Sequence, residues 1–195
     1  MNKLFVSLFV LLPGLLSLSL AADENPLVSI KTEYGPIKVE LFAEKAPTTA
    51  ANFLRYVDAG LYKGTSFYRV VRMDNQPQNT VKIEVIQGGL RFTDEDRPFP
   101  PIEHETTAKT GILHKDGVVS MARSAPGSAT SEIFICIGEQ PELDFGGKRN
   151  PDGQGFAAFG RVIEGMDIVR KIQQQPDDNQ MLKQPVVIQN IERAR

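Results

Sequence analysis

Apolar and polar residues alternate along much of the chain, which predicts a mainly β protein. Two strands are expected on either side of Gly35-Pro36, because apolar residues recur at every second position over residues 28–41. Six further strands are predicted: Ser66–Val71, Val81–Gln87, Val118–Ala122, Glu132–Ile137, Phe156–Ile163 and Val186–Glu192. Because helices do not separate these strands regularly, the pattern favours an antiparallel sheet or barrel over a parallel one.

Two segments show a helical pattern. Residues 46–57 contain Pro47, which suits a first helical turn, and Gly60 follows as a stop. Met166–Gln173 is the second predicted helix, between the last two strands. We expect the two helices to plug or flank the ends of the sheet.

Three long connections link these elements. They cover Asp74–Thr80, Thr93–Asp116 and Gly138–Gly155. Loops of this length within a compact domain are usually functional or mobile.

The first residues have the pattern of a secretory signal peptide. A single Lys3 precedes an apolar run over residues 4–20, which ends in small residues at Ala21. A Pro-Gly pair interrupts the run, which disfavours the alternative of an uncleaved membrane anchor. We therefore predict a signal peptide over residues 1–21 and one domain over residues 22–195. The mature protein is expected to be periplasmic or secreted, with no membrane contact.

Composition narrows the possible functions. The chain has 195 residues, and its 22 basic and 24 acidic side chains are interspersed, which gives no case for nucleic-acid binding. Cys136 is the only cysteine, so no internal disulfide can form, and we expect it to be a small buried hydrophobe. His104 and His114 lack metal-ligand spacing. We predict no metal, no cofactor and a monomer.

Five separated motifs point to one family. They are SFYRVV (residues 66–71), VIQGG (85–89), MARSAPGSATSEIFICIG (121–138), ELDFGG (142–147) and FAAFGRVIEGMDIV (156–169). In this order and spacing they resemble the cyclophilin family of peptidyl-prolyl cis-trans isomerases over nearly the whole mature chain. The resemblance implies a closed eight-stranded antiparallel barrel capped by two α-helices. It also implies proline-containing polypeptides as substrates.

The chemistry of such an isomerase asks for few groups. Resonance gives the X-Pro bond a rotational barrier of about 18 to 20 kcal/mol. A catalyst must hold the proline ring in an apolar pocket and offer the amide nitrogen a hydrogen-bond donor as the bond twists. Arg69 lies mid-strand, and on an inward face its charge would have no structural use. By the resemblance, Arg69 is the catalytic donor and Gln87 holds it and contacts the substrate backbone.

The resemblance also implies a set of substrate-binding positions. Phe134 and Leu143 match the proline pocket, and Val85 stands in place of a methionine. Residues 122–124 match an edge that binds the substrate backbone. The full predicted set is Phe67, Val85, Ala122, Arg123, Ser124, Glu132, Phe134, Leu143 and Phe156. The alternative for the apolar members is simple core packing, and for Arg69 a place on an outward, solvated strand face.

Four features depart from the best-known cyclophilins. The segment between Arg69 and Gln87 is about ten residues longer than usual by the resemblance, which places Glu84 where a pocket phenylalanine is expected, so that Ile83 or Val85 fills that space. Glu142 replaces a tryptophan, which puts cyclosporin sensitivity in question. Phe156 replaces a histidine, and Glu132 replaces a glutamine.

Glu132 raises a question about activity. Facing the substrate, its carboxylate would meet a carbonyl oxygen without a donor or would pair with Arg69. A charged pair of this kind would recruit basic substrates. Our hypothesis is that Glu132 tunes rate or selectivity. Glu84 and Glu132 also favour an alternative function, a non-catalytic proline-peptide-binding module or holdase. A hydrolase built on Ser124 or Ser128 lacks a base.

Overall fold

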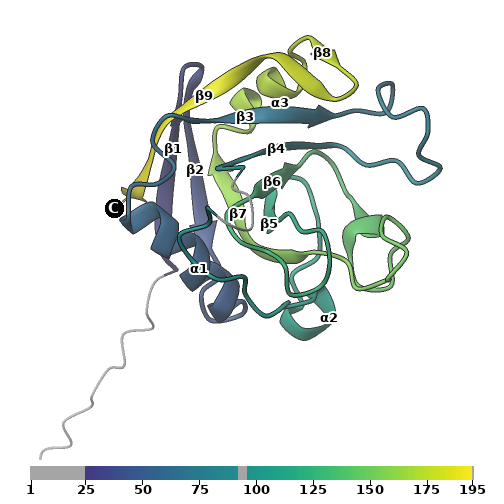
Figure 1. The fold of residues 1–195 in the computed structure, drawn as a ribbon, viewed down its shortest axis with the longest axis horizontal. Helices are drawn as coiled ribbons and strands as arrows, with labels where there is room; N and C mark the ends of the chain where they lie inside the picture. Colours follow the sequence, from purple (N-terminus) through teal and green to yellow (C-terminus); the bar gives the residue numbers. More distant parts are fainter. Residues whose placement is uncertain (1–24, 92–95, 195) are drawn as a thin grey trace, which may run out of the picture.

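The protein is a closed antiparallel β-barrel in a computed structural model that describes residues 25–91 and 96–194 (Figure 1). The predicted signal peptide, residues 1–21, lies outside the described residues. Nine strands form one sheet in the order β1-β2-β7-β5-β6-β4-β3-β9-β8, and β1 also pairs with β9. This last pairing closes eight strands into the predicted barrel and leaves β8 as an extra edge strand.

The strands follow the alternation in the sequence. Their bounds are β1 Leu27–Thr32, β2 Gly35–Leu41, β3 Thr65–Val71, β4 Val85–Gly89, β5 Val118–Met121, β6 Ile133–Cys136, β7 Ala157–Glu164, β8 Asp177–Asp178 and β9 Met181–Ala194. All eight predicted strands are confirmed, and the largest differences at their ends concern β4 and β9. Residues 81–84 are not strand, because the buried side chain of Gln76 binds the backbone of Ile83 there. Strand β9 begins at Met181, earlier than predicted.

Both predicted helices are present. Helix α1, Pro47–Asp58, has its proline in the first turn and packs against β7 and β9. Helix α3, Met166–Gln173, packs against β2, β3 and β4, and Figure 1 shows the two helices toward opposite ends of the barrel. Two short elements were not predicted, the helix α2 Thr107–Thr110 and the 3-10 helix η1 Pro141–Leu143. None of the helices in residues 25–91 and 96–194 is long and apolar enough to cross a membrane.

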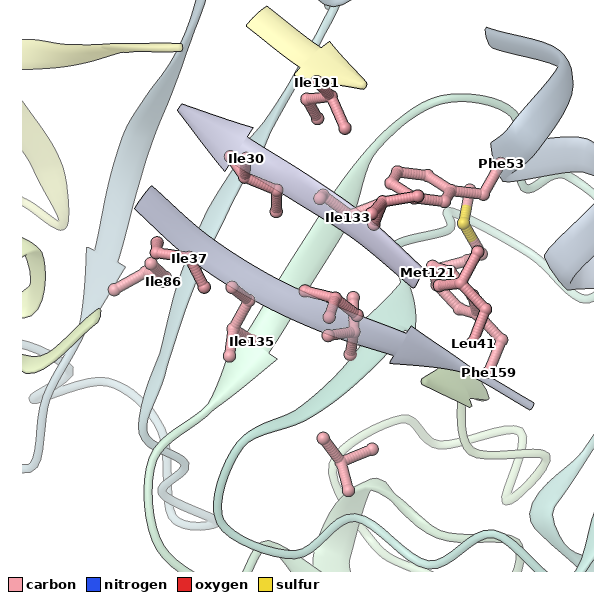
Figure 2. Packing of buried hydrophobic residues seen from close by; sticks show 14 of the residues in the cluster. Ile30, Ile37, Leu41, Phe53, Ile86, Met121, Ile133, Ile135, Phe159 and Ile191 are labelled. Atoms are coloured by element: carbon pink, nitrogen blue, oxygen red, sulfur yellow. The ribbon is translucent and has the colours of Figure 1, made fainter. Parts of the chain in front are cut away.

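The barrel interior is filled by the main hydrophobic core. Figure 2 shows Ile30 and Ile37 from the first hairpin in the same space as Ile135 and Phe53. A second, smaller hydrophobic cluster lies on the outer face of β3, β4 and β6. It consists of Val71, Ile83, Val85, Phe134, Cys136 and Leu143, with Ala122 and Phe156 packed against it. Cys136 is fully buried there, as predicted, and burial raises the pKa of its thiol.

Strand alternation explains why there are two clusters. Along β6, Ile133 and Ile135 belong to the main core, whereas Phe134 and Cys136 belong to the second cluster. Successive strand side chains point to opposite faces of the sheet. The barrel wall therefore buries one set of residues inside and places the other set on its outer face, in the second cluster.

Candidate active site

A cavity of about 250 Å³ lies over the second cluster, on the outside of the barrel wall. Strands β3, β4 and β6, the segment after β5 and the loop between η1 and β7 contribute to its walls. The lining residues are Arg69, Ile83, Val85, Gln87, Ala122, Arg123, Phe134, Leu143, Arg149, Asn150 and Phe156. One side is therefore apolar and the other carries guanidinium and amide groups, an arrangement that suits a proline ring next to a peptide bond.

Arg69 is held in one orientation by two glutamines. Its Nη1 donates to Gln87 Oε1 at 2.7 Å, and its Nε and Nη2 donate to Gln180 Oε1 at 3.1 and 2.6 Å. Arginine has five N–H groups, so these three bonds leave one N–H on each terminal nitrogen without a partner in the described part of the chain. Burial lowers the pKa of Arg69, but an arginine keeps its charge in proteins.

The face on which Arg69 lies differs from our expectation. It lies on the outer face of the barrel wall, not on an inward face. Phe67 and Arg69 would share a face if the strand alternated regularly, yet Phe67 is fully buried in the main core. The register of β3 shifts between these two residues, and such a bulge reverses the alternation. The prediction that Phe67 binds substrate is therefore wrong.

Gln87 connects the arginine to a hydrogen-bonded chain. Gln87 Nε2 donates to Tyr68 Oη at 2.9 Å, and Tyr68 Oη donates to Glu132 Oε2 at 2.5 Å. Burial, with the charge of Glu132, raises the pKa of Tyr68, so the phenol keeps its proton. The other oxygen of Glu132 accepts the backbone amide of Arg91 at 2.6 Å. Glu132 neither pairs with Arg69 nor lines the cavity, which corrects its predicted place at the substrate.

We expect Glu132→Gln to have a mild effect on catalysis. A glutamine oxygen can accept from Tyr68 or from the Arg91 amide, but not from both, so the unfolding free energy should fall by about 1 kcal/mol. Because the lost bond is two residues from the guanidinium, kcat/KM should stay within about fivefold of the parent value. A protease-coupled or NMR isomerisation assay on a neutral X-Pro peptide measures this. A loss as large as that of an Arg69 variant would place Glu132 in the site after all.

Phe134 forms the floor of the apolar side. Its ring meets Phe156 edge-on, with centroids 5.3 Å apart and planes at 89°. It also stacks on His114 at 5.9 Å. Leu143, 1% exposed, and Val85, 2% exposed, complete the wall. These four predicted substrate-binding residues are brought together around one space.

Behind Phe134 lies a buried polar chain that sequence reasoning missed. His114 Nδ1 is 2.7 Å from Asp144 Oδ1, and His114 Nε2 is 3.0 Å from Ser120 Oγ. Ser120 is fully buried, so no substrate can reach its hydroxyl. This row of hydrogen-bonded side chains supports the ring of Phe134. Its members lie up to 30 residues apart in sequence, with no motif that would connect them.

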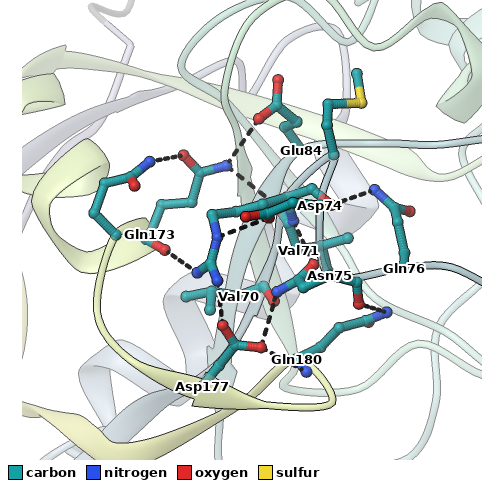
Figure 3. Close-up of polar contacts among 12 residues, drawn as sticks. Val70, Val71, Asp74, Asn75, Gln76, Glu84, Gln173, Asp177 and Gln180 are labelled. Atoms are coloured by element: carbon teal, nitrogen blue, oxygen red, sulfur yellow. Dashed lines mark hydrogen bonds and ion pairs between the residues drawn. The ribbon is translucent and has the colours of Figure 1, made fainter.

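The long connection between β3 and β4, residues 72–84, shapes one side of the cavity. Ile83 and Val85 both line it, whereas Glu84 between them turns to the other side. Figure 3 shows Glu84 directed at Gln173 of α3, whose Nε2 lies 3.4 Å from Glu84 Oε1. Ile83 and Val85, the aliphatic neighbours of Glu84, thus fill the place where the resemblance implies a pocket phenylalanine. No carboxylate enters the cavity there.

Arg123 lines the cavity, but its guanidinium mainly holds the loop that precedes Phe156. Its two terminal nitrogens donate to both carboxylate oxygens of Asp152 at 2.8 and 2.9 Å, and its Nε donates to the carbonyl of Gly155 at 2.9 Å. Hydrogen bonding to Arg123 lowers the pKa of Asp152 to about 2. The guanidinium also covers the ring of Phe156 at 5.2 Å. This pair fixes the loop that carries Phe156.

The predicted backbone edge over residues 122–124 is only partly open. The amide of Ala122 donates to the carbonyl of Glu132 at 2.8 Å, and the amide of Ser124 donates to Ser128 Oγ at 3.1 Å. Neither amide can bind a peptide without breaking an internal hydrogen bond. Ala122 lines the cavity, whereas the exposed Ser124 lies outside it.

Gln180 is a site residue that the sequence did not reveal. It lies in the two-residue turn between β8 and β9, where Asn179 and Gln180 have φ angles of 50° and 73°. Hairpin turns with two positive φ values favour glycine at the second position. Gln180 is kept in this unfavourable conformation while its side chain holds Arg69, and its Nε2 donates to the carbonyl of Asn75 at 3.3 Å (Figure 3).

We expect Gln180→Gly to separate stability from catalysis. Glycine suits the left-handed turn and so offsets part of the cost of the lost side-chain hydrogen bonds, and the unfolding free energy should fall by no more than about 1 kcal/mol. Arg69 loses its anchor on one side, so kcat should fall by about tenfold, with KM little changed. Asn179→Gly, in the same turn but without a bond to Arg69, is the control and should keep full kcat. Parent-like kcat in both variants would remove Gln180 from the site.

The described residues contain no group of three or more histidine, cysteine, aspartate or glutamate side chains that could hold a metal ion. The groups that line the cavity are guanidiniums, amides and apolar side chains. These can bind and polarise a peptide bond without forming a covalent intermediate.

Comparisons with known proteins agree with this arrangement. The family described as cyclophilin type peptidyl-prolyl cis-trans isomerase/CLD matches residues 27–193. A peptidyl-prolyl cis-trans isomerase of Acinetobacter baylyi is 37% identical over 191 residues, covering 94% of this chain and 93% of the relative. Peptidyl-prolyl cis-trans isomerase B of Escherichia coli is 35% identical over 154 residues, covering 75% of this chain and 83% of that one.

A solved structure is similar in fold. A cyclophilin type peptidyl-prolyl cis-trans isomerase of Cryptosporidium parvum gives a TM-score of 0.70 at 23% identity and covers 88% of this chain and 98% of its own. A further structure of that protein, in the presence of the dipeptide Ala-Pro, gives a TM-score of 0.68.

Proposed function

The chain belongs to the cyclophilin-type peptidyl-prolyl cis-trans isomerase family, and we propose that Arg69 performs its catalysis by donating a hydrogen bond to the prolyl nitrogen of a twisted X-Pro bond. One observation carries this proposal. The Arg69 guanidinium, held by Gln87 and Gln180, has N–H groups left over in a cavity whose opposite side is apolar.

The reaction needs no bond to be made or broken. When the X-Pro bond twists out of plane, amide resonance is lost and the lone pair localises on the proline nitrogen. A donor placed there binds the twisted state better than either planar isomer, and this difference is what accelerates the reaction. Both glutamines accept hydrogen bonds from Arg69, so they orient its planar guanidinium without neutralising its charge.

The apolar wall has the complementary task. Phe134, Leu143 and Val85 take the proline ring and exclude water from the amide. In a drier site a hydrogen bond from a charged donor is stronger than in water. With the ring fixed, the group that rotates about the X-Pro bond is the carbonyl of the residue before proline.

The alternative of a non-catalytic peptide-binding module rested on Glu84 and Glu132. Both carboxylates contact other parts of the protein, and neither lines the cavity. No observation favours that alternative over the isomerase.

A capped, uncharged peptide with one Ala-Pro bond tests the function. In exchange NMR, a catalytic amount of protein should broaden and then merge the cis and trans proline signals. The parent protein should do this at concentrations far below that of the peptide. Peptide binding without any increase in cis-trans exchange would select the holdase and refute the isomerase.

We also propose that the protein acts on exported polypeptides, as a monomer. The pattern of residues 1–21 supports export. Mass spectrometry of the protein from extracytoplasmic fractions should find a mature chain without these residues. A full-length chain confined to the cytoplasm would contradict export.

A further inference from the structure

The cavity holds an excess of positive charge that the isomerisation of a neutral peptide does not require. Arg69 and Arg149 both line it, and no aspartate or glutamate is among its described lining residues. A third cation, Arg123, is matched by its bidentate pair with Asp152. Two guanidiniums thus share one partly enclosed space without a counterion from the described part of the chain.

Arg149 is held at this place by neutral groups. Its Nη1 donates to the carbonyl of Val81 at 2.6 Å and to Gln76 Oε1 at 3.2 Å. Both partners belong to the connection over residues 72–84, and Gln76 is itself fully buried and bonded to the backbone of Ile83. The long connection therefore holds the Arg149 guanidinium at the cavity wall.

The two guanidiniums are close enough to influence each other. Burial lowers the pKa of Arg149, and the charge of Arg69 lowers it further. Like charges in a partly desolvated space repel each other, and a bound anion relieves that repulsion. Three carboxylates around the cavity are occupied elsewhere, since Asp152 pairs with Arg123, Glu132 binds Tyr68 and Glu142 accepts the amide of Lys148.

We propose that Arg149 is a specificity-determining residue and that the site prefers X-Pro substrates with a carboxylate next to the proline. The inference rests on the proposed function and names the substrate class of the same site. It reverses the expectation of basic substrates that followed from Glu132. The carboxylate is either an acidic side chain on a neighbouring residue or the free C-terminus of the proline itself.

Three peptide series distinguish these sources. In acetyl-Ala-Xaa-Pro-Ala-amide and acetyl-Ala-Ala-Pro-Xaa-amide, Xaa is glutamate, glutamine or lysine, and acetyl-Ala-Ala-Pro is compared with its amide. Exchange NMR on the full mature protein gives kcat/KM for each. We expect at least one carboxylate peptide to exceed its neutral partner by about tenfold, because a hydrogen bond to a charged group contributes that much. The lysine peptides should be the slowest.

Variants assign the preference to Arg149. Arg149→Gln should reduce the ratio of carboxylate to neutral peptide to near one, and Arg149→Lys should restore part of it. Lys148→Gln removes the same charge from an exposed neighbour and should leave the ratio unchanged. The ratio compares two substrates on one protein, so a partly unfolded sample does not change it. In 1 M salt, where the Debye length is about 3 Å, the ratio of the parent should shrink.

Two results would overturn the inference. One is equal kcat/KM for carboxylate, neutral and lysine peptides with the parent protein, and the other is a preference that persists in Arg149→Gln. Either could occur while neutral peptides are still isomerised, so the substrate class can fail without the proposed function. If no peptide is isomerised, the proposed function itself fails.

Discussion

Replacing Arg69 by alanine is expected to lower kcat/KM for a neutral X-Pro peptide by about 100- to 1000-fold, the usual cost of removing one preorganised donor from a transition state. The variant leaves the apolar wall intact, so peptide binding should suffer far less than turnover. It also frees Gln87 and Gln180, both of which have other hydrogen-bond partners in the protein.

Two further variants serve as comparisons for Arg69→Ala. Arg69→Lys keeps a charge but lacks the planar fork that reaches both glutamines, so it should recover only a small part of the rate. Arg161→Ala removes an arginine that pairs with Glu40 on the exposed surface of β7 and should be as active as the parent. An Arg69→Ala protein that isomerises at the parent rate would show that the donor has been assigned wrongly.

Replacing Phe134 by alanine is expected to lower the unfolding free energy by about 3 to 5 kcal/mol. The side chain is 4% exposed and packs between two aromatic rings, so its removal leaves a cavity that neighbouring strand residues cannot fill. Because the same ring forms the floor of the proline site, KM should also rise. Urea denaturation followed by far-UV circular dichroism measures the stability change.

The surface offers a matched control. Phe145→Ala removes an equal side chain that is 49% exposed, and its effect on stability should be below about 1 kcal/mol. Phe134→Leu should retain most of the stability while losing the edge contact to Phe156. If Phe134→Ala were as stable as Phe145→Ala, the second hydrophobic cluster would not be a packed unit.

The alternation of apolar residues predicted the strands, and helical spacing with Pro47 and Gly60 predicted α1, because each barrel strand buries one face and each helix one stripe. The resemblance placed Phe67 at the substrate, but a bulge in β3 reverses the alternation before Arg69 and leaves Phe67 in the main core. A bulge leaves no mark in composition here, since SFYRVV reads as an uninterrupted strand. The motif therefore points to Arg69 as the proposed donor without giving the face on which it lies.

Long-range contacts account for the other differences. Glu132 reaches Tyr68, 64 residues earlier, and Gln180 reaches Arg69, 111 residues earlier. No local pattern encodes such pairs. The turn that presents Gln180 was also hidden, because Asn179-Gln180 lacks the glycine that usually marks a two-residue hairpin turn. The sequence could thus predict the apolar half of the site better than the polar half.

The role of Arg69 is tested most directly by the cis-trans exchange rate of a neutral X-Pro peptide while it is bound, since this separates rotation from binding. NMR exchange with saturating peptide gives this rate for the parent and for Arg69→Ala. We predict that both bind the peptide and that exchange on the variant is slower by about 100-fold or more. Equal on-enzyme exchange rates in the two proteins would contradict the assignment of Arg69 as the donor to the prolyl nitrogen.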